Sequence, residues 1–60
     1  RNAIQDCTNA IKLNPKYAEA YYVRGIIKLA LGDSAGCLDL SKSGELGFNQ
    51  AYQVIRDHCN

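Results

Sequence analysis

The residues of this 60-residue chain best suited to chemistry are three cysteines and one histidine. His58 directly precedes Cys59, and a thiol beside an imidazole could in principle supply a nucleophile and its base. Neighbouring residues on a helix point about 100° apart, so these two side chains do not form a prearranged pair. We therefore interpret His58 as a solvated residue at a helix end, where the helix dipole favours a partly cationic ring.

The spacing of the cysteines limits what else they could do. Cys7, Cys37 and Cys59 lie far apart in the sequence, which matches neither a Cys-x-x-Cys metal knuckle nor a dense disulfide framework. The odd count leaves at least one thiol free. We expect Cys7 and Cys37 to pack as small apolar side chains, with a disulfide as the less favoured alternative. Free thiols favour a reducing compartment such as the cytoplasm, although the cysteine count alone leaves localisation open.

Other classes of function lack the residues that they need. The sequence has no glycine-rich phosphate loop and no ligand cluster at zinc spacing, so we expect no enzyme activity, no catalytic residue, no cofactor and no metal site. Seven Lys and Arg are scattered among six Asp and Glu, which leaves no basic stripe for nucleic acid. No apolar run approaches the roughly 20 residues of a membrane span. We expect neither nucleic acid nor a membrane span.

The hydrophobic periodicity predicts an all-α fold of about four antiparallel helices, because apolar residues recur at three-and-four spacing and no stretch alternates as a strand would. The first expected helix covers residues 1–13, and the second runs from Pro15 or Tyr17 to a stop at Gly32. The third is capped by Asp33 or Ser34 and ends at Gly47. The last begins near Asn49 and turns one face inward, which carries Ala51, Tyr52, Ile55 and Cys59.

Comparison of the sequence with itself indicates that these helices repeat. A first self-alignment, at a shift of 33 residues, places Asp6 on Asp39. A second self-alignment, at a shift of 31 residues, places Val23 on Val54. We therefore expect one domain that holds the second helix of a partial repeat at 1–14, a full repeat at 15–47 and a terminal capping helix at 48–60. Because the helical pattern is already running at Arg1, we interpret the chain as a fragment of a longer array.

Helical hairpins that repeat about every 33 residues are similar to the tetratricopeptide repeat (TPR). Residues 11–25 read IKLNPKYAEAYYVRG, a specific match to a common form of that repeat, and Gly36-x-x-x-Leu40 followed by Ser43 resembles its second helix. The stretch from Gly44 to Tyr52 also resembles the related Sel1-like repeats. Either resemblance implies a solenoid of stacked hairpins.

The resemblance also implies a structural ion pair between Arg24 and Asp39 of the following helix. Independently of the family, the small residues Gly25 and Gly36 should let two helix backbones approach closely. Both features would hold one hairpin together.

Ligands of the TPR family usually lie in a concave groove lined by the first helix of each repeat. The matching positions here are Glu19, Tyr22, Ile26 and Leu29, with Ala30 beside them. Two interpretations stay open for the apolar members, namely a core packed by a neighbouring repeat or partner copy, and a peptide-binding surface. None of these positions is Lys, Arg or Asn, so a segment with apolar anchors suits them better than a terminal carboxylate.

We therefore expect a non-catalytic protein–protein interaction scaffold that binds another protein or a peptide. One alternative is an accessory segment of a larger enzyme or signalling protein. The other is self-association into a homo-oligomer through exposed repeat ends, since about three repeats are usually needed for independent stability.

Overall fold

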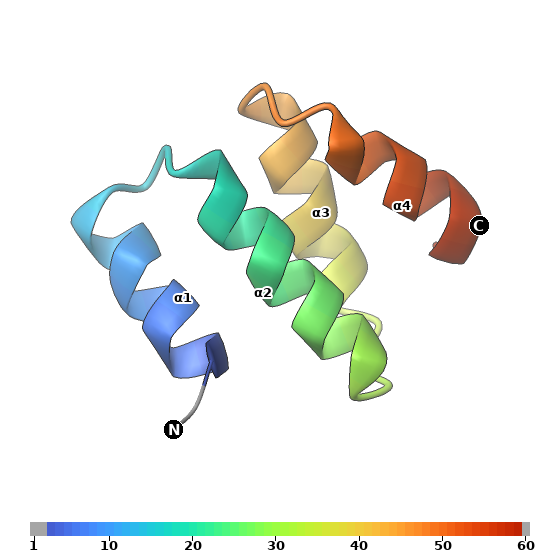
Figure 1. The fold of residues 1–60 in the computed structure, drawn as a ribbon, viewed down its shortest axis with the longest axis horizontal. Coiled ribbons are helices and arrows are strands. Elements are labelled where there is room, and N and C mark those ends of the chain that lie inside the picture. The colour runs from blue at the N-terminus through green and yellow to red at the C-terminus, as the bar shows by residue number, and fades with distance from the viewer. Residues whose placement is uncertain (1–2, 60) are drawn as a thin grey trace.

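The computed structural model describes residues 3–59 and has four α-helices and no strand within that range. The helices are α1 (Ala3–Leu13), α2 (Ala18–Ala30), α3 (Gly36–Glu45) and α4 (Gln50–His58). Consecutive helices run antiparallel, with α2 packed against both α1 and α3, and α4 packed against α3 (Figure 1). The predicted all-α class is confirmed. Arg1, Asn2 and Asn60, which the predicted outer segments include, lie outside the described residues.

The two predicted glycine stops are confirmed. Gly32 follows α2 with φ 83° and Gly47 follows α3 with φ 106°, both in the left-handed region that other residues rarely adopt. Each stop is closed by a backbone hydrogen bond of the same kind. The N–H of Asp33 donates to the carbonyl of Lys28 at 2.8 Å, and the N–H of Phe48 donates to the carbonyl of Ser43 at 3.1 Å.

The predicted starts of α2 near Tyr17 and of α4 near Asn49 are confirmed, but the polar residues that precede α2 and α3 do not cap these helices. Asn14 does not cap α2; its side-chain oxygen accepts a hydrogen bond from the N–H of Lys16 at 3.1 Å, in the turn before the helix. Asp33 accepts one from the N–H of Ala35 at 2.9 Å in the turn before α3. These short polar side chains shape a tight turn, as Asn and Asp commonly do, and the helix begins after it.

The core lies where α2 crosses α3. A methyl group on Gly25 would lie 2.8 Å from the carbonyl oxygen of Gly36 and 2.8 Å from the side chain of Leu40, so only glycine fits there. Leu40 and Ser43 are fully buried, and the hydroxyl of Ser43 donates to the carbonyl of Ala18 at 2.8 Å. The predicted close approach of Gly25 and Gly36 is confirmed.

The last helix, α4, covers the far side of α3. Ala51 is fully buried, and a methyl group on Gly44 would meet the ring of Tyr52 at 2.6 Å. Between residues 3 and 59, none of the helices has the length and apolar character needed to cross a membrane.

Candidate functional site

A groove of about 330 Å³ lies between α2 and α4. Its lining consists of Ile26, Leu29 and Ala30 of α2 together with Val54 and His58 of α4. Four of these five side chains are apolar, and the volume is at the lower end of the roughly 300–1,000 Å³ typical of ligand sites. The groove therefore has room for apolar side chains of a bound segment, and it contains three of the five predicted site residues.

The other two predicted site residues lie elsewhere. The half-buried ring of Tyr22 packs against Phe48, with centroids 4.7 Å apart and planes tilted by 47°, and so joins α2 to the segment that leads into α4. Of the two interpretations left open by the sequence, a packed core position fits Tyr22 better than a peptide-binding one. Glu19 is exposed near the start of α2, where it lines a second hollow beside α1. Glu19 lies about two helical turns before Ile26, so the helix beside Glu19 is α1, whereas the helix beside Ile26 is α4.

Val54 and His58 are groove residues that the sequence analysis did not identify. They are four residues apart in α4 and therefore share one face. The prediction instead turned a face with Ala51 and Tyr52 inward, and of these Ala51 is buried whereas Tyr52 is 49% exposed. The self-alignment that places Val23 on Val54 was the one available signal.

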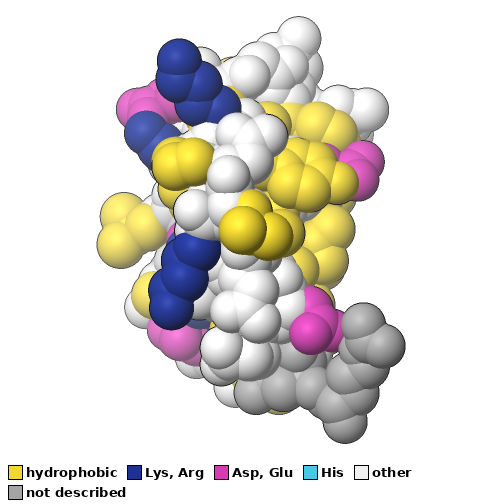
Figure 2. Space-filling view, turned by 90° about the vertical axis from the view of Figure 1, so that its left-hand side faces the viewer, with side chains coloured by type: hydrophobic (Ala, Val, Ile, Leu, Met, Phe, Trp, Pro, Cys, Tyr) yellow, Lys and Arg dark blue, Asp and Glu magenta, His cyan; other side chains and the backbone are white. Residues whose placement is uncertain are grey.

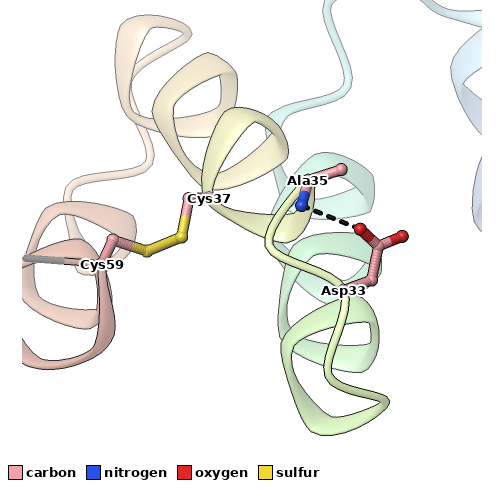
Figure 3. Close-up of a disulfide and its surroundings, with 4 residues drawn as sticks. All are labelled: Asp33, Ala35, Cys37 and Cys59. Atoms are coloured by element: carbon pink, nitrogen blue, oxygen red, sulfur yellow. Dashed lines mark hydrogen bonds between the residues drawn. A yellow bond between two sulfur atoms is a disulfide. The ribbon is translucent and has the colours of Figure 1, made fainter.

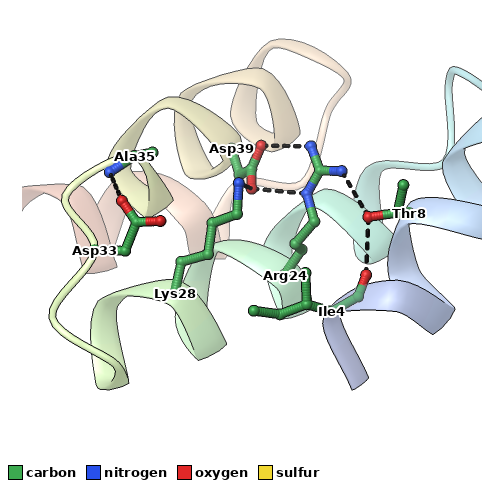
Figure 4. A network of polar contacts seen from close by, with 7 residues as sticks. All are labelled: Ile4, Thr8, Arg24, Lys28, Asp33, Ala35 and Asp39. Atoms are coloured by element: carbon green, nitrogen blue, oxygen red, sulfur yellow. Dashed lines mark hydrogen bonds and ion pairs between the residues drawn. The ribbon is translucent and has the colours of Figure 1, made fainter. Parts of the chain in front are cut away.

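A polar network fixes the position of α2 between its neighbours (Figure 4). Arg24 donates from Nε and Nη2 to the two carboxylate oxygens of Asp39, at 2.8 and 2.7 Å. The ammonium of Lys28 lies 3.3 Å from the same carboxylate. Nη1 of Arg24 also donates to the hydroxyl of Thr8 at 3.2 Å, and that hydroxyl donates to the carbonyl of Ile4 at 2.9 Å. The predicted Arg24–Asp39 pair is confirmed, and it extends to α1.

The pKa values of Asp39 and Arg24 both shift in the direction that favours the charged form of the side chain. Burial of Asp39 raises its pKa, but the hydrogen bonds from Arg24 and the charges of Arg24 and Lys28 outweigh that effect and hold the pKa below its ordinary value. The hydrogen bond to Asp39 is the main reason why the pKa of Arg24 is raised. The guanidinium also lies 5.5 Å from the ring centroid of Tyr21. The network orients α2, and with it the α2 wall of the groove.

Replacing Asp39 with asparagine should therefore destabilise the fold. The side chains of Arg24 and Asp39 are 17% and 10% exposed, so the expected loss of about 2 kcal/mol lies between that of an exposed pair and that of a buried one. Urea unfolding of the wild type and Asp39→Asn at neutral pH measures it.

The same pair of proteins gives a pH dependence with a definite sign. The folded-state pKa of Asp39 is lowered, so its contribution is complete above the unfolded-state pKa of about 3.9 and is lost as the pH falls through the folded-state value. The stability difference between wild type and Asp39→Asn should therefore shrink below about pH 4. A difference that stays constant down to about pH 2 would show that the ionised carboxylate is not what stabilises the fold.

A disulfide joins Cys37 in the first turn of α3 to Cys59 just after α4 (Figure 3). Their Cα atoms are 6.0 Å apart. The expectation that Cys37 packs as a free thiol is wrong, because α4 returns along α3 and brings the end of the chain back to the start of that helix. Cys7 is free, which confirms the prediction of at least one unpaired thiol. Because Cys37 and Cys59 are paired, they do not favour a reducing compartment as free thiols would.

Within the described part of the chain, no three His, Cys, Asp or Glu side chains gather as metal ligands. The sequence matches no protein-family model, and no solved structure gives a significant match. The groove between α2 and α4 is the feature on which a proposal of function rests.

Proposed function

We propose that this chain is a segment of a TPR-like helical-hairpin solenoid and that it acts as a non-catalytic scaffold for protein–protein interaction. It binds apolar side chains of a peptide or protein segment in the groove between α2 and α4. The observation that carries the proposal is that Ile26, Leu29 and Ala30, three residues that match ligand-facing positions of the TPR family, line one groove.

The arrangement of the helices supports the solenoid part of the proposal. Consecutive helices pack side by side in a slab of 30 × 25 × 13 Å (Figure 1). The α2–α3 hairpin has the close crossing expected from the small residues Gly25 and Gly36, and it has the Arg24–Asp39 pair that the resemblance implied. Stacked hairpins of this kind leave long surfaces open to partners.

The chemistry of the lining favours apolar anchors. His58, at the end of α4, is the only lining side chain that can form hydrogen bonds, and no Lys or Arg lines the groove to hold a terminal carboxylate. A helix with apolar residues at three-and-four spacing, or an extended segment with alternate apolar residues, presents such anchors. The ligand expected here is therefore an internal segment of a protein.

The proposal can be tested with a display library of random peptides selected on the wild-type protein. We expect enriched peptides with two or more apolar anchors, and we expect Ala30→Glu to weaken their binding by about tenfold or more, because a carboxylate in the groove removes its apolar lining. Fluorescence anisotropy with a labelled peptide measures the affinities.

The matched control is Leu31→Glu, at a residue that is 72% exposed, follows Ala30 directly and does not line the groove. This substitution adds the same charge one position away and should leave peptide affinity unchanged. Equal losses in the two variants, or no peptide that depends on Ala30, would contradict the groove as the binding site.

A further inference from the structure

The Cys37–Cys59 disulfide lies at one end of the groove between α2 and α4. Cys59 directly follows His58, which lines the groove, and Cys37 lies in the first turn of α3 (Figure 3). α2 packs against α3 and α3 packs against α4, so the distance between the two groove walls depends on how α3 holds α4. The bond is therefore placed to fix the α4 wall of the groove.

The two halves of α4 are held against α3 in different ways. In the first half, Ala51 is fully buried and the ring of Tyr52 lies against Gly44. In the second half and its cap, none of residues 54–59 is buried, and three of them are exposed. The half of α4 that lines the groove is thus tied to α3 by a covalent bond at a place where no buried side chain holds it.

Opening the bond would leave the core of the fold in place. The α2–α3 crossing is held by the buried side chain of Leu40 against Gly25. Hydrogen bonds from Arg24 to Asp39 hold the same two helices together. Because these contacts do not involve α4, loss of the bond should release the second half of α4 and leave the α2–α3 hairpin intact.

The bond is open to small thiols. Cys37 and Cys59 are both half-buried rather than enclosed in the core. Exposed disulfides are the ones that are commonly labile or regulatory, whereas enclosed structural bonds resist reduction. The position of this bond therefore allows it to open and close in the folded protein.

The third cysteine does not take part in the exchange within one molecule. Cys7 lies on α1, at the opposite end of the row of helices from α4 (Figure 1). Figure 2 looks onto the α1 end, where apolar side chains lie among charged ones. Reduction of the bond therefore requires an external thiol.

We propose that the Cys37–Cys59 disulfide is a redox switch for the groove. The closed bond holds the α4 wall in place, and reduction by a small thiol of the glutathione class releases that wall and weakens binding of the peptide segment. This inference rests on the proposed function, because it assigns regulation to the same groove.

The reaction is an ordinary thiol–disulfide exchange. The thiolate of the small thiol attacks Sγ of Cys59 to form a mixed disulfide, and Sγ of Cys37 leaves with the electron pair of the broken bond and takes a proton from water. Cys37 is the better leaving group because the dipole of α3 favours a negative charge in its first turn. A second small thiol then attacks the mixed disulfide, which frees Cys59 as a thiol and yields the oxidised small molecule.

The first test follows the α4 wall without any ligand. Cys7→Ala protein, which contains only the two bonded cysteines, is equilibrated with mixtures of reduced and oxidised glutathione. We expect the bond to open and close reversibly in the folded protein. On reduction, the amide protection of residues 54–58 should fall by about tenfold or more, while that of Leu40 stays unchanged.

The second test uses a peptide selected from the library on the oxidised protein. Reduction should weaken its binding by about tenfold, which is within the usual range of coupling between two sites. Linkage then requires the reverse effect at equal size, so saturating peptide should lower the equilibrium constant for reduction by glutathione about tenfold. A bond that only stabilises the fold would show no such effect of the peptide.

The matched control is the double variant Cys37→Ser, Cys59→Ser in the same Cys7→Ala protein. It cannot form the bond, so it should bind the peptide with the affinity of the reduced protein. Its amide protection and its peptide affinity should not respond to the glutathione mixture.

Four results would overturn the switch. These are a bond that glutathione does not open in the folded protein, unchanged protection of residues 54–58 after reduction, loss of protection at Leu40 together with α4, and equal affinity of the peptide for the oxidised and reduced protein. A lack of peptide binding to the oxidised protein would instead contradict the proposed function, and the ligand-free test would then decide whether the bond controls the α4 wall.

Discussion

We expect Gly25→Leu to lower the free energy of unfolding by about 3 kcal/mol, the upper end of the usual cost of overpacking a core. The added side chain starts 2.8 Å from the backbone oxygen of Gly36, which cannot move without separating α2 from α3. A chain of 60 residues is typically stabilised by only about 3–9 kcal/mol, so the variant should be largely unfolded at about 37 °C. Thermal unfolding followed by circular dichroism measures the loss.

A matched pair of alanine variants separates crowding from helix propensity. In an exposed helix, replacing glycine with alanine stabilises by about 1 kcal/mol. Gly25→Ala should nevertheless destabilise, because its methyl group meets backbone and Leu40. Gly44→Ala should be close to neutral, since the atoms nearest to its methyl group belong to the ring of Tyr52, which is 49% exposed and can swing aside. Similar effects at the two glycines would contradict the close crossing at Gly25.

Removing the disulfide with the double variant Cys37→Ala, Cys59→Ala should cost about 3 kcal/mol, as expected for a loop closed between residues 22 apart in the sequence. The loss should fall mainly on α4, which the bond ties to α3. Hydrogen exchange should show reduced amide protection in Gln50–His58, while Leu40 at the α2–α3 crossing stays protected.

Cys7→Ala is the control for the disulfide variant, because Cys7 is free and its replacement should change stability by less than about 1 kcal/mol. The disulfide variant should also bind groove peptides more weakly, since α4 contributes Val54 and His58 to the lining. Unchanged protection of α4 after loss of the bond would show that packing alone positions this wall.

The features that sequence analysis predicted correctly are those set by local pattern or by repetition. Apolar spacing gave the four helices, and glycine chemistry gave the stops at Gly32 and Gly47. The pairing of Arg24 with Asp39 followed from a repeat motif rather than from tertiary geometry.

The features that it missed depend on how helices lie relative to one another. The Cys37–Cys59 bond requires the end of α4 to return to the start of α3, which no local pattern encodes. The groove wall formed by Val54 and His58 depends in the same way on the approach of α4 to α2. Glu19 was included among the site residues because it matches a groove position of the TPR family, and such a match does not tell which neighbour faces each end of a helix.

The most direct test of the proposed scaffold function is the solution structure of the protein bound to a library-selected peptide, determined from intermolecular NOEs. We expect the apolar anchors of the peptide to contact the methyl groups of Ile26, Leu29 and Val54, with the Tyr22–Phe48 contact retained. NOEs that place the anchors on Leu13 or Leu38, which are exposed and lie outside the groove, would contradict the assignment of the groove as the binding site.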